Sequence, residues 1–475
     1  MTMVLPAFID GRPLVCANTY DNIDPSSGSS LGPVSQCGVA EVDEAVAAAR
    51  RVQPQWEHTS PEDRARLLTK LADLIERDAE SLALLECEDT GKPLSQARAD
   101  ALVCARYFRF YGHAIDSYYG VTIPLGPGVH AYTRREPFGV TGHIVAWNYP
   151  MQLFGRAVAP AIATGNCSVV KPADETPRTA VAIAELATGA GLPAGVLNVV
   201  PGIGPEAGAA LSTHPGVDHI GFVGSTQIGM VIAHAAAERV VPVVLELGGK
   251  SAQIVFPDAD LNTAATFVVK AILQNAGQTC SAGSRLLVHE SVHDQLLSRV
   301  AKKFAAVRIG PGRSDPDLGP LVSRKQQSRV KAFLDNLTKG EVVVGGGIPQ
   351  APELSGGAYF EPTLIDGVDP EAEIAQQEIF GPVVVANTFT SEEEAISLAN
   401  GTQYALLGAV WTADVSRAHR LAAQIRAGQV YVNTYGAGGG VELPFGGFQK
   451  SGYGREKGYQ ALDTFTATKT IVIKL

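Results

Sequence analysis

The chain lacks the long apolar runs and the cysteine spacing that mark membrane proteins and disulfide-stapled proteins. Its richest apolar stretch, Ala264 to Leu273, is broken by Lys270 and falls short of the roughly 18 residues that a transmembrane helix needs. The opening segment, MTMVLPAFIDGRPL, has neither the basic start nor the apolar core of a secretory signal. The six cysteines include no CxxC pair and are too sparse for a disulfide framework. We therefore expect a cytoplasmic protein with no membrane contact.

Charge is scarce and mainly negative. Charged residues make up 18% of the chain, and 38 Lys and Arg against 48 Asp and Glu leave a net charge of −10. An acidic chain favours solubility and disfavours a nucleic-acid surface. The hydrophobic fraction of 45% excludes disorder as the main state. At about 150 residues per domain, the 475 residues predict a globular protein of two or three domains.

Strand and helix patterns alternate over most of the chain. From Glu41 to Arg109, apolar residues recur at helical spacing. After Val140, β-branched runs alternate with helical stretches, and the runs are GHIVAW, CSVVKP, VLNVV, HIGFV and VPVVLEL. A second series begins after Gly248 with AQIVF and SRLLV. The alternation predicts an α/β protein with parallel sheets, and we expect Gly248-Gly249 to separate two α/β domains.

Two β-rich segments fit neither domain. Residues 119–137 have β-rich ends around a Gly/Pro turn, and the chain ends in FTATKTIVIKL, an alternating pattern with nothing after it to pair with. Because exposed apolar strand edges are usually covered, we interpret both segments as oligomerisation strands. The alternative is an edge hairpin and a tail that pack on their own subunit.

Three motifs are similar to known ligand sites but do not meet their requirements. Residues 289–293 spell HExxH, yet the first histidine ends a predicted strand and Ser291 has the character of an N-cap, so the helix would begin between the two histidines. Residues 249–251 (GKS) have Val244 where a P-loop needs glycine. The GxGxxxG spacing at 202–208 is a weak form of a dinucleotide fingerprint. We expect no metal site.

Polar residues stand at the ends of predicted strands and in one small-residue loop. Cys280 lies in GQTCSAGS, which leaves room for a substrate carbonyl beside a thiolate nucleophile. Glu246 and Asn148 each end an apolar strand, where a carboxylate suits a general base and an amide suits an oxyanion donor. The turn FVGST at 222–226 opens a helix and suits a pyrophosphate. Each also has a structural explanation: a buried cysteine, a paired core carboxylate, a turn asparagine or an ordinary strand–helix turn.

These residues occur in stretches that resemble the aldehyde dehydrogenase superfamily over essentially the whole chain. The matching stretches are AWNYP at 146–150, KPADETP at 171–177, GFVGST at 221–226, LELGGK at 245–250, GQTCSAGSR at 277–285, EIFGP at 378–382 and PFGG at 444–447. The resemblance implies a Rossmann-like parallel-sheet cofactor domain, an α/β catalytic domain and a small β bridging element for oligomerisation. The implied boundaries are 1–118 and 138–248 for the dinucleotide-binding domain, 249–446 for the catalytic domain, and 119–137 with 460–475 for the oligomerisation element.

The resemblance also implies a role for each matching residue. Cys280 would be the nucleophile, Glu246 the general base, and Asn148 an oxyanion donor together with the Cys280 backbone N–H. The implied cofactor-binding residues are Trp147, Lys171, Asp174, Gly224, Ser225, Glu378 and Phe380. The implied substrate tunnel includes Tyr149, Leu153 and Arg156.

The implied reaction is the NAD(P)-dependent oxidation of an aldehyde to a carboxylic acid through a cysteine thiohemiacetal and a thioester. Asp174 would repel the 2′-phosphate of NADP, which favours NAD. CoA-acylating aldehyde dehydrogenases are the alternative, disfavoured because that group commonly lacks a Glu at the position of Glu246. The expected partners are a small aldehyde and further copies of the chain, in a homodimer or homotetramer.

Arg156 leaves the substrate class open. A buried guanidinium needs a partner, which would be either a substrate carboxylate, as in semialdehyde dehydrogenases, or a structural group beside a bulky apolar or aromatic aldehyde. The second Arg of a semialdehyde clamp would stand at Gln274, so we favour the bulky or aromatic aldehyde. Some relatives relay protons through a Lys at the position of Ala157 and a Glu at that of Glu456, and this chain has the Glu alone, which leaves a relay undecided.

Overall fold

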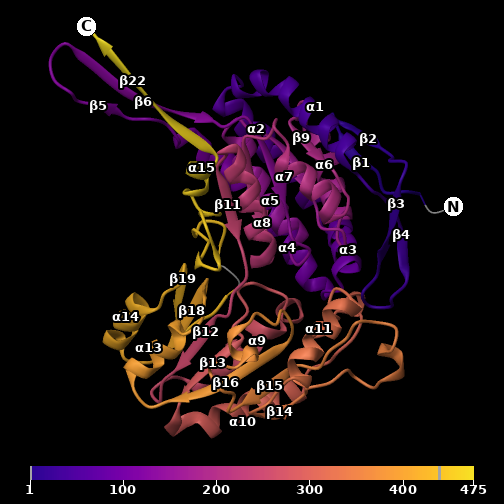
Figure 1. The fold of residues 1–475 in the computed structure, drawn as a ribbon, viewed down its shortest axis with the longest axis vertical. Coiled ribbons are helices and arrows are strands. Elements are labelled where there is room, and N and C mark those ends of the chain that lie inside the picture. Colours follow the sequence, from indigo (N-terminus) through magenta and orange to yellow (C-terminus); the bar gives the residue numbers. More distant parts are fainter. Residues whose placement is uncertain (1–2, 437–439) are drawn as a thin grey trace.

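Two α/β units and a projecting β-arm make up the computed structural model, which describes residues 3–436 and 440–475. In Figure 1 the indigo and magenta unit lies above the orange unit, and the arm carries the C-terminus to the upper left. Within the described ranges, no helix is long and apolar enough to cross a membrane. The two units with their parallel strands confirm the predicted α/β fold class.

The first sheet has eight strands in the order β2-β1-β9-β8-β7-β10-β11-β21. In that order the strands are Arg12–Leu14, Ala7–Ile9, Leu197–Val199, Cys167–Lys171, Val140–Ile144, His219–Val223, Val243–Glu246 and Gly452–Tyr453. The strands from β9 to β11 run parallel, as the sequence pattern predicts. The edge strands β1, β2 and β21 pair antiparallel, so both ends of the chain complete this sheet.

Helices of the first unit pack against this sheet and against one another. They are α1 (Val39–Glu57), α2 (Pro61–Arg77), α3 (Ala79–Thr90), α4 (Leu94–Ala114), α5 (Pro150–Ala163), α6 (Arg178–Ala190), α7 (Ala209–Thr213) and α8 (Thr226–Arg239). The start of α2 matches the sequence signal, since Pro61 is its first residue and the Ser60 hydroxyl accepts from the Asp63 amide at 3.1 Å. A separate hairpin of β3 (Thr19–Ile23) and β4 (Ser30–Ser35) precedes α1.

The second sheet has seven strands in the order β14-β15-β16-β13-β12-β18-β19. In that order they are Glu341–Val344, Thr363–Asp366, Val383–Phe389, Arg285–His289, Ala252–Val255, Leu407–Trp411 and Gln429–Val432. Its helices are α9 (Leu261–Leu273), α10 (His293–Ala305), α11 (Arg324–Asp335), α12 (Glu373–Gln376), α13 (Glu392–Asn400) and α14 (Val415–Gln424). The chain passes from the first sheet to the second between Glu246 and Ala252, the segment that contains Gly248-Gly249.

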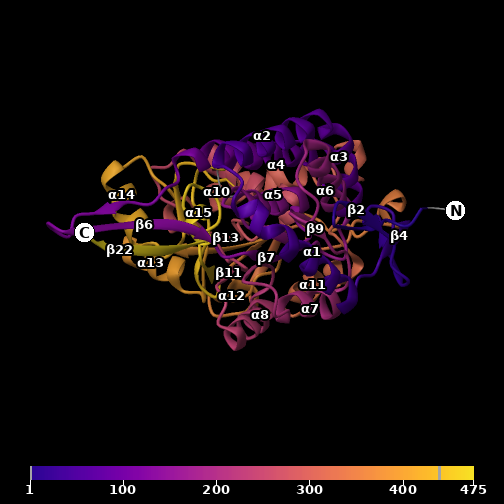
Figure 2. The same cartoon turned by 90° about the horizontal axis from the view of Figure 1, so that it is seen from above.

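The arm joins an internal segment to the end of the chain. It consists of β5 (Thr122–Ile123), β6 (Val129–Pro137) and β22 (Thr466–Lys474), in the order β22-β6-β5. The last strand pairs with β6 along its whole length, antiparallel, from Thr466 opposite Pro137 to Lys474 opposite Val129. Figure 2 shows the arm extending beyond the helices. The two predicted strand segments therefore pair with each other, while their use in oligomerisation stays a prediction.

As predicted, no continuous helix carries both histidines of the HExxH segment, although the capping residue differs from the predicted one. After β13 ends at His289, a 3-10 turn covers Glu290–Val292 and α10 begins at His293. The predicted N-cap at Ser291 is wrong, because the turn extends past it and His289 accepts from the Ser291 amide instead. The second histidine instead contacts Asp366 at 2.9 Å through Nε2. The two histidines thus belong to different elements and share no continuous helical face.

Candidate active site

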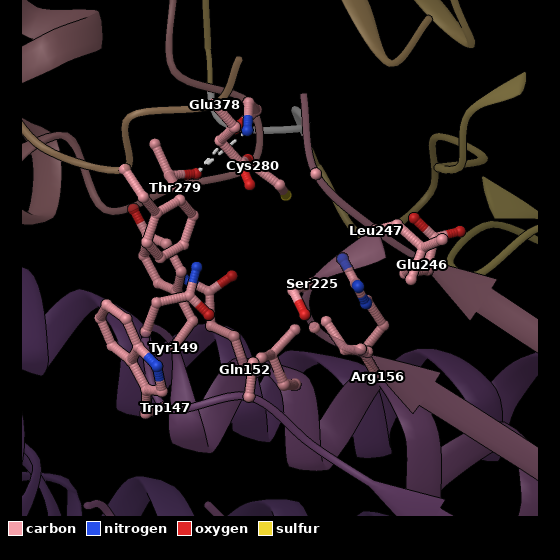
Figure 3. Close-up of a pocket in the computed structure, with 18 of the residues that line it drawn as sticks. Trp147, Tyr149, Gln152, Arg156, Ser225, Glu246, Leu247, Thr279, Cys280 and Glu378 are labelled. Atoms are coloured by element: carbon pink, nitrogen blue, oxygen red, sulfur yellow. Dashed lines mark hydrogen bonds between the residues drawn. The ribbon is translucent and has the colours of Figure 1, made fainter. Parts of the chain in front are cut away.

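A cavity of about 200 Å³ lies where the two α/β units meet, and it collects side chains from both. The predicted site residues that line it are Trp147, Asn148, Tyr149, Leu153, Arg156, Gly224, Ser225, Glu246, Cys280, Glu378 and Phe380. Figure 3 shows many of them arranged around one space. Lys171 and Asp174 do not line it, and Asp174 faces a neighbouring hollow beside the β3–β4 hairpin.

The loop that carries Cys280 is bent by an unusual backbone. After α9 ends, Asn275 and Ala276 have φ of 48° and 55°, and Gly277 has φ of 72°. A left-handed conformation costs free energy in residues other than glycine, so the surrounding contacts must hold it. Gln278 supplies two of them: its side chain donates to the Asn275 carbonyl at 2.9 Å and accepts from the Val322 amide at 2.8 Å. The loop is therefore fixed before any substrate binds.

Cys280 lies against Gly249, in the segment that connects the two sheets. A Cβ on Gly249 would lie 2.2 Å from the Cys280 carbonyl oxygen, so only glycine allows this approach. Burial raises the pKa of the Cys280 thiol to about 12, although the positive charge of Arg156 opposes the shift. The thiol is half-buried, and it must lose its proton to act as a nucleophile.

Asn148 is tied to the same loop. Its side-chain amide donates to the Gln278 carbonyl at 3.0 Å, and the Asn275 side-chain amide donates to the Asn148 backbone carbonyl at 2.8 Å. A side-chain amide has two N–H groups, so one remains for a substrate oxygen beside Cys280. The Asn148 side chain thus has the position and the donor that an oxyanion hole needs.

Glu246 is a buried carboxyl with no hydrogen-bond partner for either oxygen among the described residues. Burial raises its pKa well above the usual range, with a further rise from the nearby Glu456 carboxyl and an opposing effect of Arg156. In Figure 3 the Glu246 carboxyl stands apart from Cys280 and points away from it. A role as base toward the Cys280 carbon therefore requires the side chain to turn.

Arg156 has a partner within the chain. Its guanidinium forms a buried ion pair with Glu456 and lies 5.0 Å from the centre of the Phe445 ring. The sequence indicated that this Arg needs a partner but could not identify it, because Glu456 lies 300 residues further along the chain. The cavity wall also includes residues that the sequence analysis did not single out, namely Tyr107, Gln152, Thr279, Phe445 and Lys457.

The other side of the cavity fits a dinucleotide. Ser225 caps the N-terminus of α8, and helix N-termini of this kind bind pyrophosphate. Glu378 accepts from the Gly249 amide at 2.9 Å, and burial raises its pKa to about 7. Trp147 and Phe380 meet edge to face, with ring centres 5.2 Å apart. Lys171, at the end of β8, forms an ion pair with Asp174, where the resemblance places the adenosine ribose.

A buried charge cluster beneath the cavity was not evident in the sequence. Lys92 contacts Glu86 at 2.6 Å and Asp100 at 2.5 Å, and all three side chains are almost fully buried. Glu86 also accepts from the Met151 amide at 3.1 Å at the start of α5, and Asp100 accepts from Gln152 at 2.6 Å. The cluster therefore anchors the helix that carries Gln152, Leu153 and Arg156. No local pattern reveals it, because the contacts join α3, α4 and α5.

Comparisons with known proteins find relatives that match nearly the whole chain. The sequence profile described as the aldehyde dehydrogenase family matches residues 15–471. The NADP/NAD-dependent aldehyde dehydrogenase PuuC of Escherichia coli is 42% identical, with 98% of this chain and 95% of PuuC covered. The indole-3-acetaldehyde dehydrogenase AldA of P. syringae, solved with NAD+ and IAA, has a TM-score of 0.97, 41% identity and coverage of 100% and 97%. PnpE of Pseudomonas sp. WBC-3 has a TM-score of 0.97, 39% identity and coverage of 99% and 98%.

The close contact between Gly249 and Cys280 predicts that a methyl group added at position 249 strongly lowers turnover. In Gly249→Ala the new Cβ must displace the Cys280 loop, and a shift of about 1 Å at a reacting atom can lower turnover on the order of 100-fold. Steady-state kinetics with a saturating aldehyde measure this loss. Gly208→Ala is the control, because a Cβ there meets nothing within 4 Å. Equal kinetics for Gly249→Ala and the control would contradict the prediction.

The cluster around Lys92 predicts an effect on stability. Lys92→Met leaves Glu86 and Asp100 buried without their cation, which costs about 3–5 kcal/mol and lowers the thermal unfolding midpoint. The matched control is Lys331→Met, which breaks a half-exposed pair with Asp335 at 2.6 Å and costs less than about 1 kcal/mol. Similar unfolding midpoints for the two variants would show that the buried cluster is not a stabilising anchor.

Proposed function

The chain belongs to the aldehyde dehydrogenase family, and we propose that it oxidises an aldehyde to a carboxylic acid with NAD or NADP through a thiohemiacetal and a thioester on Cys280. One observation carries the proposal. A single cavity between the two α/β units holds Cys280, Asn148 and Glu246, which come from three separate parts of the chain. One wall of this cavity suits an aldehyde, and the other wall suits a dinucleotide.

NAD is the cofactor that the site favours, with NADP as the second candidate. Asp174 lies beside Lys171 at the expected ribose position, where a carboxylate repels a 2′-phosphate. The relatives support both choices, because AldA binds NAD+ and PuuC is named NADP/NAD-dependent. The nicotinamide ring, when bound, accepts the hydride that leaves the substrate carbon. Ser225 would hold the phosphates of the dinucleotide, and Glu378 would hold its nicotinamide ribose.

Acylation starts at the Cys280 sulfur. The Cys280 thiol releases its proton to solvent water, and the thiolate sulfur then adds to the aldehyde carbon, so that a negative charge develops on the substrate oxygen. The Asn148 amide and the Cys280 backbone N–H stabilise that charge by hydrogen bonding. Loss of hydride from the same carbon leaves a thioester on Cys280.

Deacylation needs a water and a base. A carboxyl whose pKa is raised by burial binds protons strongly, which suits Glu246 to remove one from water. The side chain turns from its resting position toward the thioester, and the water oxygen attacks the acyl carbon. The bond between the acyl carbon and the Cys280 sulfur then breaks, the acid leaves, and Glu246 passes the proton that it took from water to the sulfur. The presence of Glu246 also argues against CoA as the acyl acceptor.

The cavity wall supports a bulky apolar or aromatic aldehyde as the substrate. Tyr149, Leu153 and Phe445 offer apolar surface beside Cys280. The Arg156–Glu456 ion pair supplies the partner that Arg156 needs without a substrate carboxylate. A semialdehyde carboxylate would have to compete with Glu456 for the same guanidinium, so this second candidate is disfavoured. We propose that the chain works as a homodimer or homotetramer in the cytoplasm, joined through the arm.

The nucleophile is tested by Cys280→Ala. The variant should bind NAD with unchanged affinity but form no NADH from any aldehyde, because no thiohemiacetal can form. NADH absorbance and cofactor titration measure the two properties, and Cys167→Ala is the control for loss of a buried thiol. Turnover of the Cys280→Ala variant near the wild-type rate would exclude the proposed chemistry.

Glu246→Gln separates the two half-reactions. The variant should still transfer hydride, so a burst of NADH close to one per active site precedes a steady rate lowered on the order of 100-fold or more. Stopped-flow absorbance resolves the burst. Added CoA should not restore the steady rate. Recovery of turnover with CoA would favour the acylating alternative, and unchanged kinetics would make Glu246 structural.

Arg156→Ala tests the substrate class. We expect kcat/KM to fall by a similar factor for hexanal and for its ω-carboxylated analogue, because the Arg acts through Glu456 and not on the substrate. The two aldehydes have the same chain length, so each serves as the control for the other. A large rise in KM confined to the carboxylated aldehyde would support the semialdehyde alternative.

A further inference from the structure

Two cysteines outside the active-site cavity lie side by side. Cys16 follows β2 and Cys37 precedes α1, and their sulfur atoms are 3.6 Å apart. Both side chains belong to the core of the first unit. The catalytic scheme above uses neither thiol, and neither residue lines the cavity that contains Cys280.

The two thiols differ in environment. Cys16 keeps 8% of its surface exposed, whereas Cys37 is fully buried. The hydrogen bond between the two thiols lowers the pKa of Cys16, and the same bond together with burial raises the pKa of Cys37. Cys16 is therefore the better nucleophile and the one nearer to solvent, and Cys37 stands beside it as a resolving thiol.

We propose that Cys16 and Cys37 form a reversible intrachain disulfide when the protein meets a two-electron oxidant such as hydrogen peroxide. The Cys16 thiolate attacks one peroxide oxygen and takes up an OH group, and the other oxygen leaves as water once it is protonated. The Cys37 sulfur then attacks the Cys16 sulfur, an S–S bond forms, and the OH group leaves as a second water with the Cys37 proton. Two thiols are oxidised by two electrons and peroxide is reduced, so the step balances.

The two sulfur atoms need to approach by less than about 2 Å. A disulfide joins sulfurs about 2.0 Å apart, and the present separation is 3.6 Å. The backbone at both residues is already held, because the Cys16 amide donates to Ser35 at 3.2 Å and the Cys37 amide donates to the Pro201 carbonyl at 2.8 Å. The backbone at Cys16 and Cys37 is thus held in place while the two side chains turn.

The bond would close the β3–β4 hairpin into a covalent loop. The hairpin lines the hollow that also contains Asp174, at the ribose end of the proposed cofactor site. Pro201, which holds the Cys37 amide, follows β9 at the carboxyl edge of the first sheet. Oxidation would therefore rigidify this edge, with a higher unfolding midpoint and a hairpin that resists proteolysis.

Mass spectrometry of the full-length chain tests the proposal. The test uses the Cys280→Ala background, because peroxide would otherwise oxidise the half-buried Cys280 as well. Limiting hydrogen peroxide should yield a product lighter by two hydrogens, with one cross-linked peptide that contains Cys16 and Cys37. Dithiothreitol should reverse both changes and the rise in unfolding midpoint.

Matched variants make the result specific. Cys16→Ser and Cys37→Ser in the same background should each abolish the cross-link, whereas Cys167→Ser should keep it. If a serine variant fails to fold, the wild-type chain alkylated first at Cys280 gives the same measurement without substitution. Sulfinic acid on Cys16 with no cross-link would overturn the proposal, and so would two unchanged thiols after prolonged peroxide. Neither outcome bears on the aldehyde chemistry of Cys280.

Discussion

The close approach of Gly249 to the Cys280 carbonyl is the constraint on which the site depends. It occurs where the chain passes from β11 to β12, so the Cys280 loop of the second unit touches the end of the first sheet. Gly277 meets a similar limit on the other side of the loop, since a Cβ there would lie 2.1 Å from the Gly381 carbonyl. Cys280 is thus held between the segment that supplies Glu246 and the segment that supplies Glu378 and Phe380. Because Gly249 and Gly277 have no side chains, these three segments can line one substrate site.

Buried charge organises the other wall of the cavity. The Lys92 cluster holds the start of α5, and the Arg156–Glu456 pair holds a site about one and a half turns further along the same helix. Isolated charges in a protein interior are costly, and each is retained here with a partner of opposite sign. Glu246 differs, because its two oxygens lack hydrogen-bond partners among the described residues. Glu246 is therefore an unpaired carboxyl in the same cavity as Cys280, and it can accept a proton once its side chain turns.

The sequence predicted the central strands and the helices better than the edge strands and the contacts between distant parts of the chain. Parallel strands follow from β-branched runs between helices, and the helix start at Pro61 follows from local capping. The edge strand β21, the Arg156–Glu456 pair and the Lys92 cluster join residues far apart in the chain, and periodicity carries no signal for such contacts. The site residues were found through motif resemblance. Their gathering in one cavity is a product of tertiary packing, which also set Lys171 and Asp174 outside that lining.

Two strands near the end of the chain pair with strands that lie much earlier in the sequence. The edge strand β21 completes the first sheet beside β11, and β22 pairs with β6, more than 300 residues earlier. A ribosome that adds about 5–20 residues per second therefore releases β6 long before its partner strand exists. Through most of synthesis β6 is an unsatisfied strand edge, the kind of surface that chaperones shield and that aggregates form upon. We therefore expect β6 to need protection until β22 has left the ribosome.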